Sequence, residues 1–119
     1  DMPPGIGDET LDVINLVKKS KFMVVTTPSK VAMGAVSKLL KMLKEQKLPL
    51  IGVLENMKMK KSDFVKNSVS DMDIEYLGAI GFDEGLEEAI GEPELLYDTS
   101  FMKDMDKIVS NILWKEAMF

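Results

Sequence analysis

The chain alternates between short apolar runs and longer segments in which apolar residues recur at helical spacing. The apolar runs cover 22–27, 49–54 and 74–80, contain β-branched residues and are bounded by turn-forming residues. The first two are almost continuously apolar, which is typical of strands covered on both faces. Because helical patterns separate the runs, the sequence predicts a parallel sheet built from right-handed βαβ units.

The helical segments differ in how clearly their ends are marked. The helix that follows the apolar run 22–27 is expected to take Thr27 as its N-cap and Pro28 as its first residue. A shorter helix is expected over 84–90, and the polar stretch 57–73 reads as a loop with a short helix, its lysines forming a solvated surface. The apolar positions that define the three longer helices are Leu11, Ile14 and Val17; Ala32, Val36, Leu39, Leu40 and Leu43; and Phe101, Met105, Ile108, Ile112 and Trp114.

Composition narrows the chemistry that these elements can carry. The 119 residues allow one domain, and 45% hydrophobic residues with a mean hydropathy near zero fit a soluble globular protein. A net charge of −5 argues against binding to nucleic acid. All 15 basic residues are Lys, so the chain cannot supply an arginine finger. It contains no Cys and no His, which excludes thiolate metal sites and imidazole acid–base chemistry within these residues.

The stretch Asp1-Met-Pro-Pro-Gly5-Ile-Gly7-Asp8 is the most informative motif. In P-loop enzymes an acidic residue at the end of a strand holds a magnesium-bound water, and a nearby glycine offers its N–H to the terminal phosphate. Two prolines between such residues stiffen the turn. An ordinary Pro-Gly turn ahead of a helix capped by Asp8 explains the same residues. The motif alone therefore leaves both interpretations open.

Three further blocks follow this motif: Val25-Thr-Thr-Pro28, Gly52-Val-Leu-Glu-Asn-Met57, and Tyr76-Leu-Gly-Ala-Ile80 followed by Asp83. In order and spacing, the four blocks resemble the Mrp/ApbC branch of the MinD-like P-loop ATPases over nearly the whole chain. The resemblance implies an α/β fold, a partial parallel-sheet P-loop NTPase with Rossmann-like α/β/α layers that lacks its N-terminal half. Residues 1–119 would be the C-terminal part of one such domain, with a switch segment at 1–8, an adenine-side strand end at 49–57 and a C-terminal helix at about 100–118.

The resemblance also implies roles for three residues. Asp1 matches the switch acid, which acts on magnesium indirectly, and Gly5 matches the glycine that faces the terminal phosphate. Asn56 matches the asparagine that reads the adenine base, and its amide can both donate and accept a hydrogen bond. Asp8 is either catalytic or an N-cap, and the cap is the preferred interpretation. ATP and magnesium are therefore the expected cofactors of a longer parent protein.

Several residues depart from the family pattern. Iron–sulfur carriers of this family have a Cys-x-x-Cys shortly after the Asn-Met block. The corresponding residues of this chain, 58–64, contain no Cys. The chain is therefore not expected to hold a cluster in the way that these carriers do. Gly81 stands where relatives commonly have Pro, which weakens the assignment of nucleotide preference. No Gly-x-x-x-x-Gly-Lys-Ser/Thr occurs in the chain. We expect the chain alone neither to bind ATP tightly nor to hydrolyse it, with Asp1 a solvated terminus.

Three functions follow from these features. The first is part of a cytoplasmic ATPase whose nucleotide state controls a dimer that carries or helps insert an iron–sulfur cluster for a client protein. The alternative is a MinD/ParA-like positioning or regulatory switch. MinD-type proteins bind membranes through a basic amphipathic helix, but the lysines of 101–119 are offset by acids, so core packing explains its apolar face better and no membrane binding is expected. The third is an interaction domain that self-associates, as a homodimer or otherwise, through an exposed strand edge and an apolar face.

Overall fold

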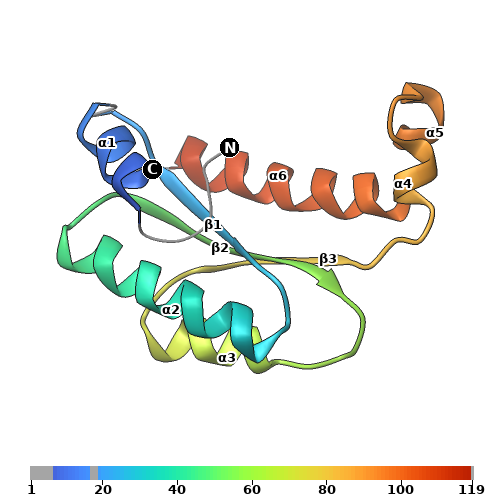
Figure 1. The fold of residues 1–119 in the computed structure, drawn as a ribbon. Coiled ribbons are helices and arrows are strands. Elements are labelled where there is room, and N and C mark those ends of the chain that lie inside the picture. The colour runs from blue at the N-terminus through green and yellow to red at the C-terminus, as the bar shows by residue number, and fades with distance from the viewer. Residues whose placement is uncertain (1–6, 17–18, 119) are drawn as a thin grey trace.

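The computed structural model describes residues 7–16 and 19–118 and contains three parallel strands in the order β1-β2-β3. The strands are β1 (Phe22–Thr26), β2 (Leu50–Lys58) and β3 (Tyr76–Gly81). Helix α6 lies on one face of the sheet, and α2 and α3 lie on the other (Figure 1). The predicted parallel α/β sheet with helices on both sides is therefore confirmed. The helices are α1 (Asp8–Leu16), α2 (Lys30–Glu45), α3 (Phe64–Asp71), α4 (Leu86–Ala89), α5 (Pro93–Tyr97) and α6 (Ser100–Met118).

Helix α2 begins two residues later than the sequence predicted. Ser29 is its N-cap, and the Ser29 side chain accepts a hydrogen bond from the backbone N–H of Ala32 at 3.3 Å. Because Pro disfavours the helical conformation in the residue before it, Thr27 stays outside the helix as part of the turn that leaves β1. The prediction that Thr27 caps this helix is therefore wrong, and Ser29 performs that role.

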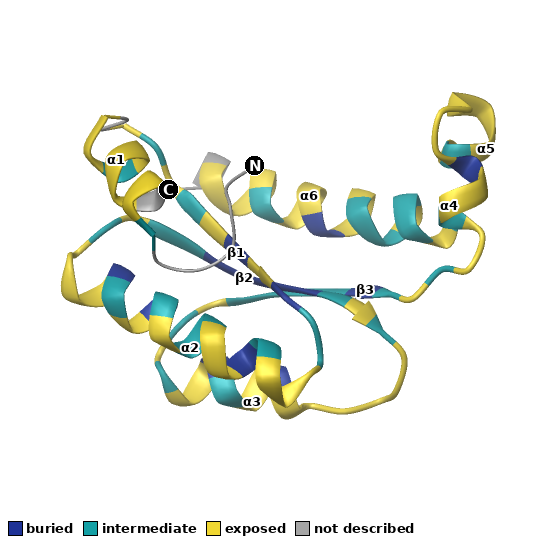
Figure 2. Cartoon of the chain, viewed as in Figure 1, coloured by how far each residue is buried: buried dark blue, intermediate teal, exposed yellow. Residues whose placement is uncertain are grey.

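The lower layer of the core is formed by α2 and α3 against the sheet. Leu40 of α2, Val53 of β2 and Val69 of α3 are completely buried at its centre. Each aliphatic side chain removed from water in this way contributes about 1.5–3 kcal/mol. Figure 2 shows the buried residues concentrated in the strands and on the inward sides of the helices. This layer covers one face of β2, and only together with the layer on the other face does it explain the nearly continuous apolar run of that strand.

The upper layer is formed by α6 alone over β2 and β3. Phe101, Met105, Ile108 and Ile112 pack against the buried side chains of Leu54 and Ile80. A Cβ atom at Gly78 would lie 3.1 Å from Cγ1 of Ile108, so the missing side chain lets the helix approach β3. The prediction that the apolar face of this helix serves core packing is confirmed for these four residues. It is wrong for Trp114, which is 65% exposed because it lies about 200° around the helix from Ile112.

Strand β1 is covered on one face only, contrary to the prediction of two covered faces. Val24 and Thr26 are buried toward the lower layer. Met23 and Val25 point to the other face and are 44% and 50% exposed, because α6 packs over β3 and the neighbouring part of β2. The continuous apolar run therefore predicts the position of the strand correctly, but it predicts incorrectly that both faces of the strand are covered.

The connection between β3 and α6 contains two short helices rather than one. The helix predicted over 84–90 is shorter, and α5 was not predicted. Pro93 is the first residue of α5, a position that suits Pro because its missing N–H has no partner there. Within the described ranges 7–16 and 19–118, no helix is both long and apolar enough to cross a membrane.

Candidate functional site

The carboxyl ends of the three parallel strands meet at one edge of the sheet. In open parallel α/β sheets, ligands bind in the crevice outside these carboxyl ends. The predicted adenine-reading residue, Asn56, lies near the end of β2 at this edge. The loops that follow β2 and β3 border the same edge, and Phe82 joins them by donating its backbone N–H to the Lys58 carbonyl at 3.0 Å. Of the three predicted site residues, the structure thus places Asn56 at an edge where a ligand could bind.

Asn56 sits in an irregular part of β2. The strand advances from Glu55 to Lys58 while its partner advances only from Ala79 to Gly81, so β2 carries an extra residue there. Met57 adopts a left-handed backbone with φ of 60°, and its N–H donates to Oδ1 of Asn56 at 2.8 Å. Such a conformation costs about 1–3 kcal/mol in a non-glycine residue and clusters at functional sites.

The bulge leaves Asn56 with unused hydrogen-bonding capacity. Its side chain is half-buried, and its carbonyl oxygen already accepts from Met57. Within the described part of the chain, its amide nitrogen donates to no group. A side-chain amide nitrogen carries two N–H donors. Asn56 can therefore offer a donor to a ligand at the edge of the sheet without losing the hydrogen bond that holds its own orientation.

A buried polar network lies directly behind Asn56 and was not predicted. Glu55 is only 1% exposed, accepts a hydrogen bond from the Tyr76 hydroxyl at 2.7 Å, and lies 3.7 Å from Nζ of Lys58. Burial raises the pKa of Tyr76, and the hydrogen bond to Glu55 raises it further, so the phenol stays neutral and keeps donating. The contacts join the second half of β2 to the first residue of β3. A sequence signal did exist, because Glu55 shares the strand periodicity of buried Val53.

Asp83, the acid of the fourth sequence block, is engaged in local structure. Its Oδ1 accepts from the Gly85 N–H at 2.9 Å, and its Oδ2 accepts from the Ser100 hydroxyl at 3.0 Å and the Phe101 N–H at 3.2 Å. The Phe101 and Gly85 N–H groups, in that order, lower the pKa of this carboxyl. Asp83 therefore ties the loop after β3 to the first turn of α6.

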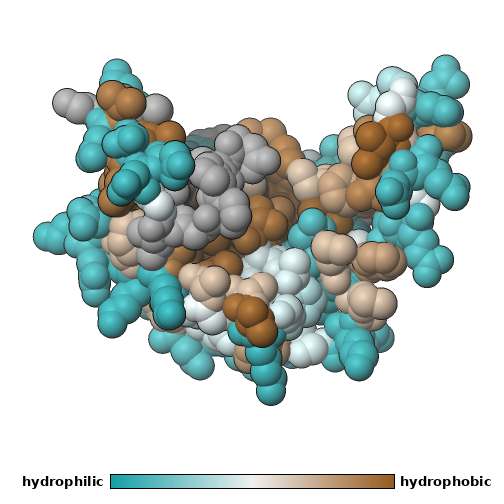
Figure 3. Space-filling view, viewed as in Figure 1, coloured by the Kyte–Doolittle hydropathy of each residue, from teal (hydrophilic) through white to brown (hydrophobic). Residues whose placement is uncertain are grey.

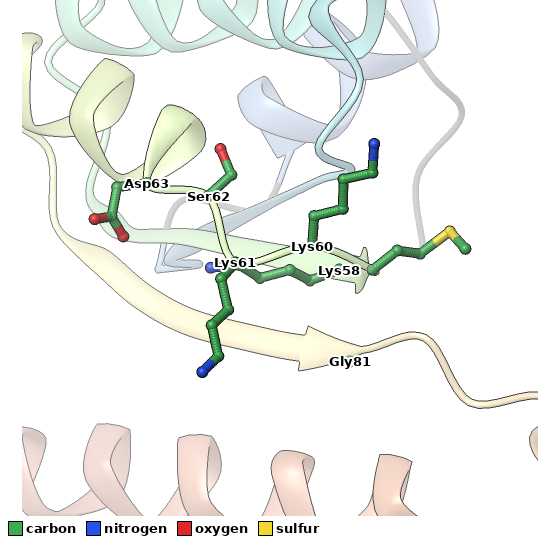
Figure 4. A pocket seen from close by; sticks show the side chains of 7 residues that line it. Lys58, Lys60, Lys61, Ser62, Asp63 and Gly81 are labelled. Atoms are coloured by element: carbon green, nitrogen blue, oxygen red, sulfur yellow. The ribbon is translucent and has the colours of Figure 1, made fainter.

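A cavity of about 540 Å³ opens beside the same edge, lined by residues 58–63 and Gly81 (Figure 4). Its cationic side chains do not converge: Lys60 and Lys61 point in opposite directions in Figure 4, and Lys58 is paired with Glu55. The described residues contain no group of three or more Cys, His, Asp or Glu side chains placed to hold a metal. The cavity thus has a positive rim but neither a metal site nor a cradle for an anion.

The remaining predicted site residues do not join Asn56 in the described structure. Asp1 and Gly5 lie outside the described residues. Helix α1 begins at Asp8 itself, and the Gly7 carbonyl accepts the N–H of Leu11 at 3.2 Å. Gly7 therefore occupies the N-cap position, and the prediction that Asp8 is the cap is wrong by one residue. Asp8 instead places its charge in the first turn, where the helix dipole favours acids.

The parallel sheet with helices on both faces, and a polar site at its carboxyl edge, fit an open α/β protein, and the match to a family model makes its class the P-loop NTPases. Comparison with family models narrows the class. The chain belongs to the NUBPL iron-transfer P-loop NTPase family, whose model matches residues 1–115. The resemblance drawn from the four sequence blocks is confirmed by this match.

Several curated proteins are similar to the chain over most of its length. An iron-sulfur cluster carrier protein from Pyrococcus horikoshii is 30% identical over 131 aligned residues, which cover 94% of this chain and 44% of the relative. The carrier protein of the same name from Aquifex aeolicus is 36% identical over 78% of this chain and 29% of its own length. A cytosolic Fe-S cluster assembly factor Nubp1 homolog from Drosophila ananassae is 28% identical over 95% of the chain and 44% of the relative. The chain spans less than half the length of these relatives.

Proposed function

We propose that this chain is the C-terminal portion of a cytoplasmic Mrp-like protein in which ATP binding and hydrolysis are linked to iron–sulfur cluster carriage or assembly. Family membership and the names of the similar proteins support the link to clusters. The observation that carries the nucleotide part is the free amide nitrogen of Asn56 at the carboxyl edge of the sheet. In this proposal Asn56 reads the base, while the rest of the site comes from residues outside the described structure.

The described residues fit only the base end of a nucleotide. Asn56 offers a donor on a rigid support, because the neighbouring Glu55 is buried and hydrogen-bonded to Tyr76. The phosphate end lacks a counterpart, since the chain has no Gly-x-x-x-x-Gly-Lys-Ser/Thr loop to surround phosphates with backbone N–H groups. Magnesium and the phosphates would therefore be held mainly by the parent's other half, with Asp1 and Gly5 contributing as a switch.

The cluster itself would have no ligand in this chain. Iron–sulfur clusters are held by Cys thiolates, and the chain contains no Cys or His. The loop over residues 58–63, next to the carboxyl edge, carries three lysines instead. The parent would therefore bind a cluster through cysteines elsewhere, and this portion would contribute base recognition and a cationic surface beside the site.

Nucleotide titration tests the base-reading role. Isothermal titration of ATP and magnesium into the chain alone should show no micromolar binding, and a micromolar dissociation constant would contradict the missing phosphate site. In the longer parent, Asn56→Ala should weaken ATP binding about tenfold, the effect of one lost hydrogen bond of about 1.4 kcal/mol, and should reduce discrimination against GTP. Asn67→Ala, on the exposed side of α3, is the matched control. Equal ATP affinity of the two variants would show that Asn56 does not contribute to nucleotide binding.

Cluster uptake separates this function from a MinD/ParA-like switch. Under anaerobic reconstitution with iron and sulfide, the parent should acquire the visible absorption of a cluster, whereas this chain alone should not because it offers no thiolate. Co-sedimentation of the parent with anionic liposomes, without cluster uptake, would support the switch instead. The α6 side chains that pack on Leu54 and Ile80 would become available to a membrane only if the helix left the sheet.

A further inference from the structure

A pair of charged side chains brackets the bulge that carries Asn56. The bulge lies between Glu55 and Lys58, which pair with Ala79 and Gly81 of β3. In a regular strand, side chains three positions apart point to opposite faces. The extra residue of the bulge brings Lys58 onto the face of Glu55, where its Nζ lies 3.7 Å from Oε1 of that carboxylate. The ion pair therefore favours the bulged form of the strand.

The bulge needs such support because of its backbone. The left-handed conformation of Met57 is sparsely populated in residues other than glycine and persists only where the surrounding structure holds it. The Met57 N–H donates to Oδ1 of Asn56, so the orientation of the Asn56 amide depends on the same conformation. On the far side of the bulge, the Lys58 carbonyl accepts the N–H of Phe82 at 3.0 Å. The contacts that fix Met57 therefore also aim the amide nitrogen of Asn56.

Tyr76 holds the near side of the bulge from the neighbouring strand. Its hydroxyl donates to Oε1 of Glu55, the same oxygen that faces Lys58. Because Glu55 is almost fully buried, water has little access to replace either partner. The Tyr76 side chain is itself packed against the core cluster that contains Val53 and Val69, which keeps the hydroxyl in place. Loss of the hydroxyl would leave the buried carboxylate without this donor and free the start of the bulge to shift.

We propose that Tyr76 and Lys58 are positioning residues for nucleotide recognition, and that they act through Glu55 on the bulge that aims Asn56. The inference rests on the proposed function, in which Asn56 reads the base. Asn56 contacts the nucleotide, and the other three residues set the fraction of molecules in which its amide is correctly aimed. The apparent affinity for a ligand falls in proportion to that fraction. The largest effect that a positioning variant can have is therefore that of removing the Asn56 amide itself.

A double-mutant cycle in the longer parent protein tests the inference, with isothermal titration of ATP and magnesium. Tyr76→Phe should raise the ATP dissociation constant about threefold, below the limit of about tenfold set by Asn56→Ala. In the Asn56→Ala background the same change should have no further effect, because no amide is left to aim. An equal factor in both backgrounds would overturn the inference, since Tyr76 would then act on nucleotide binding by another route.

Tyr97→Phe is the matched control for the tyrosine. It removes the same hydroxyl from a side chain that is 71% exposed on α5, and the variant should bind ATP like the wild type. Circular dichroism establishes that each variant is folded. A loss of affinity in Tyr97→Phe equal to that in Tyr76→Phe would overturn the inference, because the effect would then not depend on the contact with Glu55.

Lys58→Met tests the other partner of Glu55 by removing the charge and keeping most of the aliphatic stem. It should raise the ATP dissociation constant about twofold, again only where Asn56 is present. Figure 3 shows hydrophilic side chains projecting around the lower side of the molecule, so a general effect of surface charge needs a control. Lys60→Met removes the same charge from the same loop and should leave the affinity unchanged. Equal weakening by the two variants would overturn the role of Lys58.

Nitrogen-15 relaxation of side-chain amides in the nucleotide-free parent gives a readout that a loss of stability alone would not change. The Asn56 amide should be ordered in the wild type and mobile in Tyr76→Phe, whereas the Asn67 amide on α3 should behave alike in both. An equally ordered Asn56 in both proteins would overturn the inference. Unchanged ATP affinity in Asn56→Ala would refute the base-reading role itself. An effect of Asn56→Ala without one of Tyr76→Phe would refute only the positioning.

Discussion

Gly52 is the position at which a single added methyl group should do the most damage to this fold. It lies in the buried part of β2 with φ of 154°, a backbone conformation that other residues rarely adopt. A Cβ atom there would lie 2.6 Å from the Glu75 carbonyl oxygen and 2.9 Å from Cδ2 of Leu77. The Glu75 oxygen cannot simply retreat, because it accepts the Val53 N–H at 2.9 Å in the pairing of β2 with β3.

The cost of Gly52→Ala follows from two separate effects. Forcing extra atoms into a packed core costs about 1–3 kcal/mol. Holding a non-glycine residue in a sparsely populated conformation costs about 1–3 kcal/mol more. The sum, roughly 2–6 kcal/mol, is a large share of the 5–15 kcal/mol that stabilises a typical domain. We therefore expect Gly52→Ala to be severely destabilised, and Asn56 on the same strand to lose its support.

Urea denaturation followed by circular dichroism measures this effect, with Gly34→Ala as the control. Gly34 is exposed in α2, and a Cβ atom there would meet nothing within 4 Å. Because Gly is a poor helix former, Gly34→Ala should stabilise the protein by about 0.5–1 kcal/mol. The same substitution should thus act in opposite directions at the two sites. If both variants unfolded at the urea concentration of the wild type, the inferred close contact of β2 with Glu75 would be refuted.

Two further predictions concern the polar contacts of Glu55 and Asp83. Tyr76→Phe removes the hydroxyl that donates to buried Glu55 and should lower the free energy of unfolding by about 1–3 kcal/mol, measured in urea; an unchanged midpoint would mean that Glu55 finds another donor. Asp83→Ala should destabilise the protein at neutral pH, because the pKa of Asp83 is lowered in the folded state. That contribution is present above the ordinary pKa of 3.8 and is lost as pH falls through the folded value, so the two proteins should converge in acid; a constant difference would exclude an ionic role.

The sequence predicted the positions of the strands and helices better than it predicted which of their faces are buried and where each helix begins. Apolar runs located all three strands, because a strand buried among parallel neighbours needs apolar residues on both faces. The same reasoning was wrong for β1, because its apolar residues Met23 and Val25 are exposed. An apolar run does not indicate which elements will pack against the strand. The cap of α2 was misplaced because Thr27 and Ser29 both suit the role, and only the path of the turn selects Ser29.

The family resemblance predicted which residues belong to the site, but not the contacts that those residues make. Asn56 was placed correctly at a strand end, but the bulge that leaves its amide nitrogen free depends on the pairing of β2 with β3. The burial of Glu55 was readable from its periodicity with Val53, whereas its partner Tyr76 was not, because that contact joins two strands. Asp83 received no role from the sequence, because its contact with the first turn of α6 joins residues 18 positions apart.

The strand order β1-β2-β3 has a consequence for how the chain would fold during synthesis. Each strand pairs with the one made just before it, so the sheet and its lower layer can assemble from sequential neighbours with short loops to close. The upper layer forms later, because α6 follows all three strands in the chain. Leu54 and Ile80 therefore stay open to solvent until α6 has been synthesised, which leaves the nascent chain exposed to aggregation or chaperone binding up to that point.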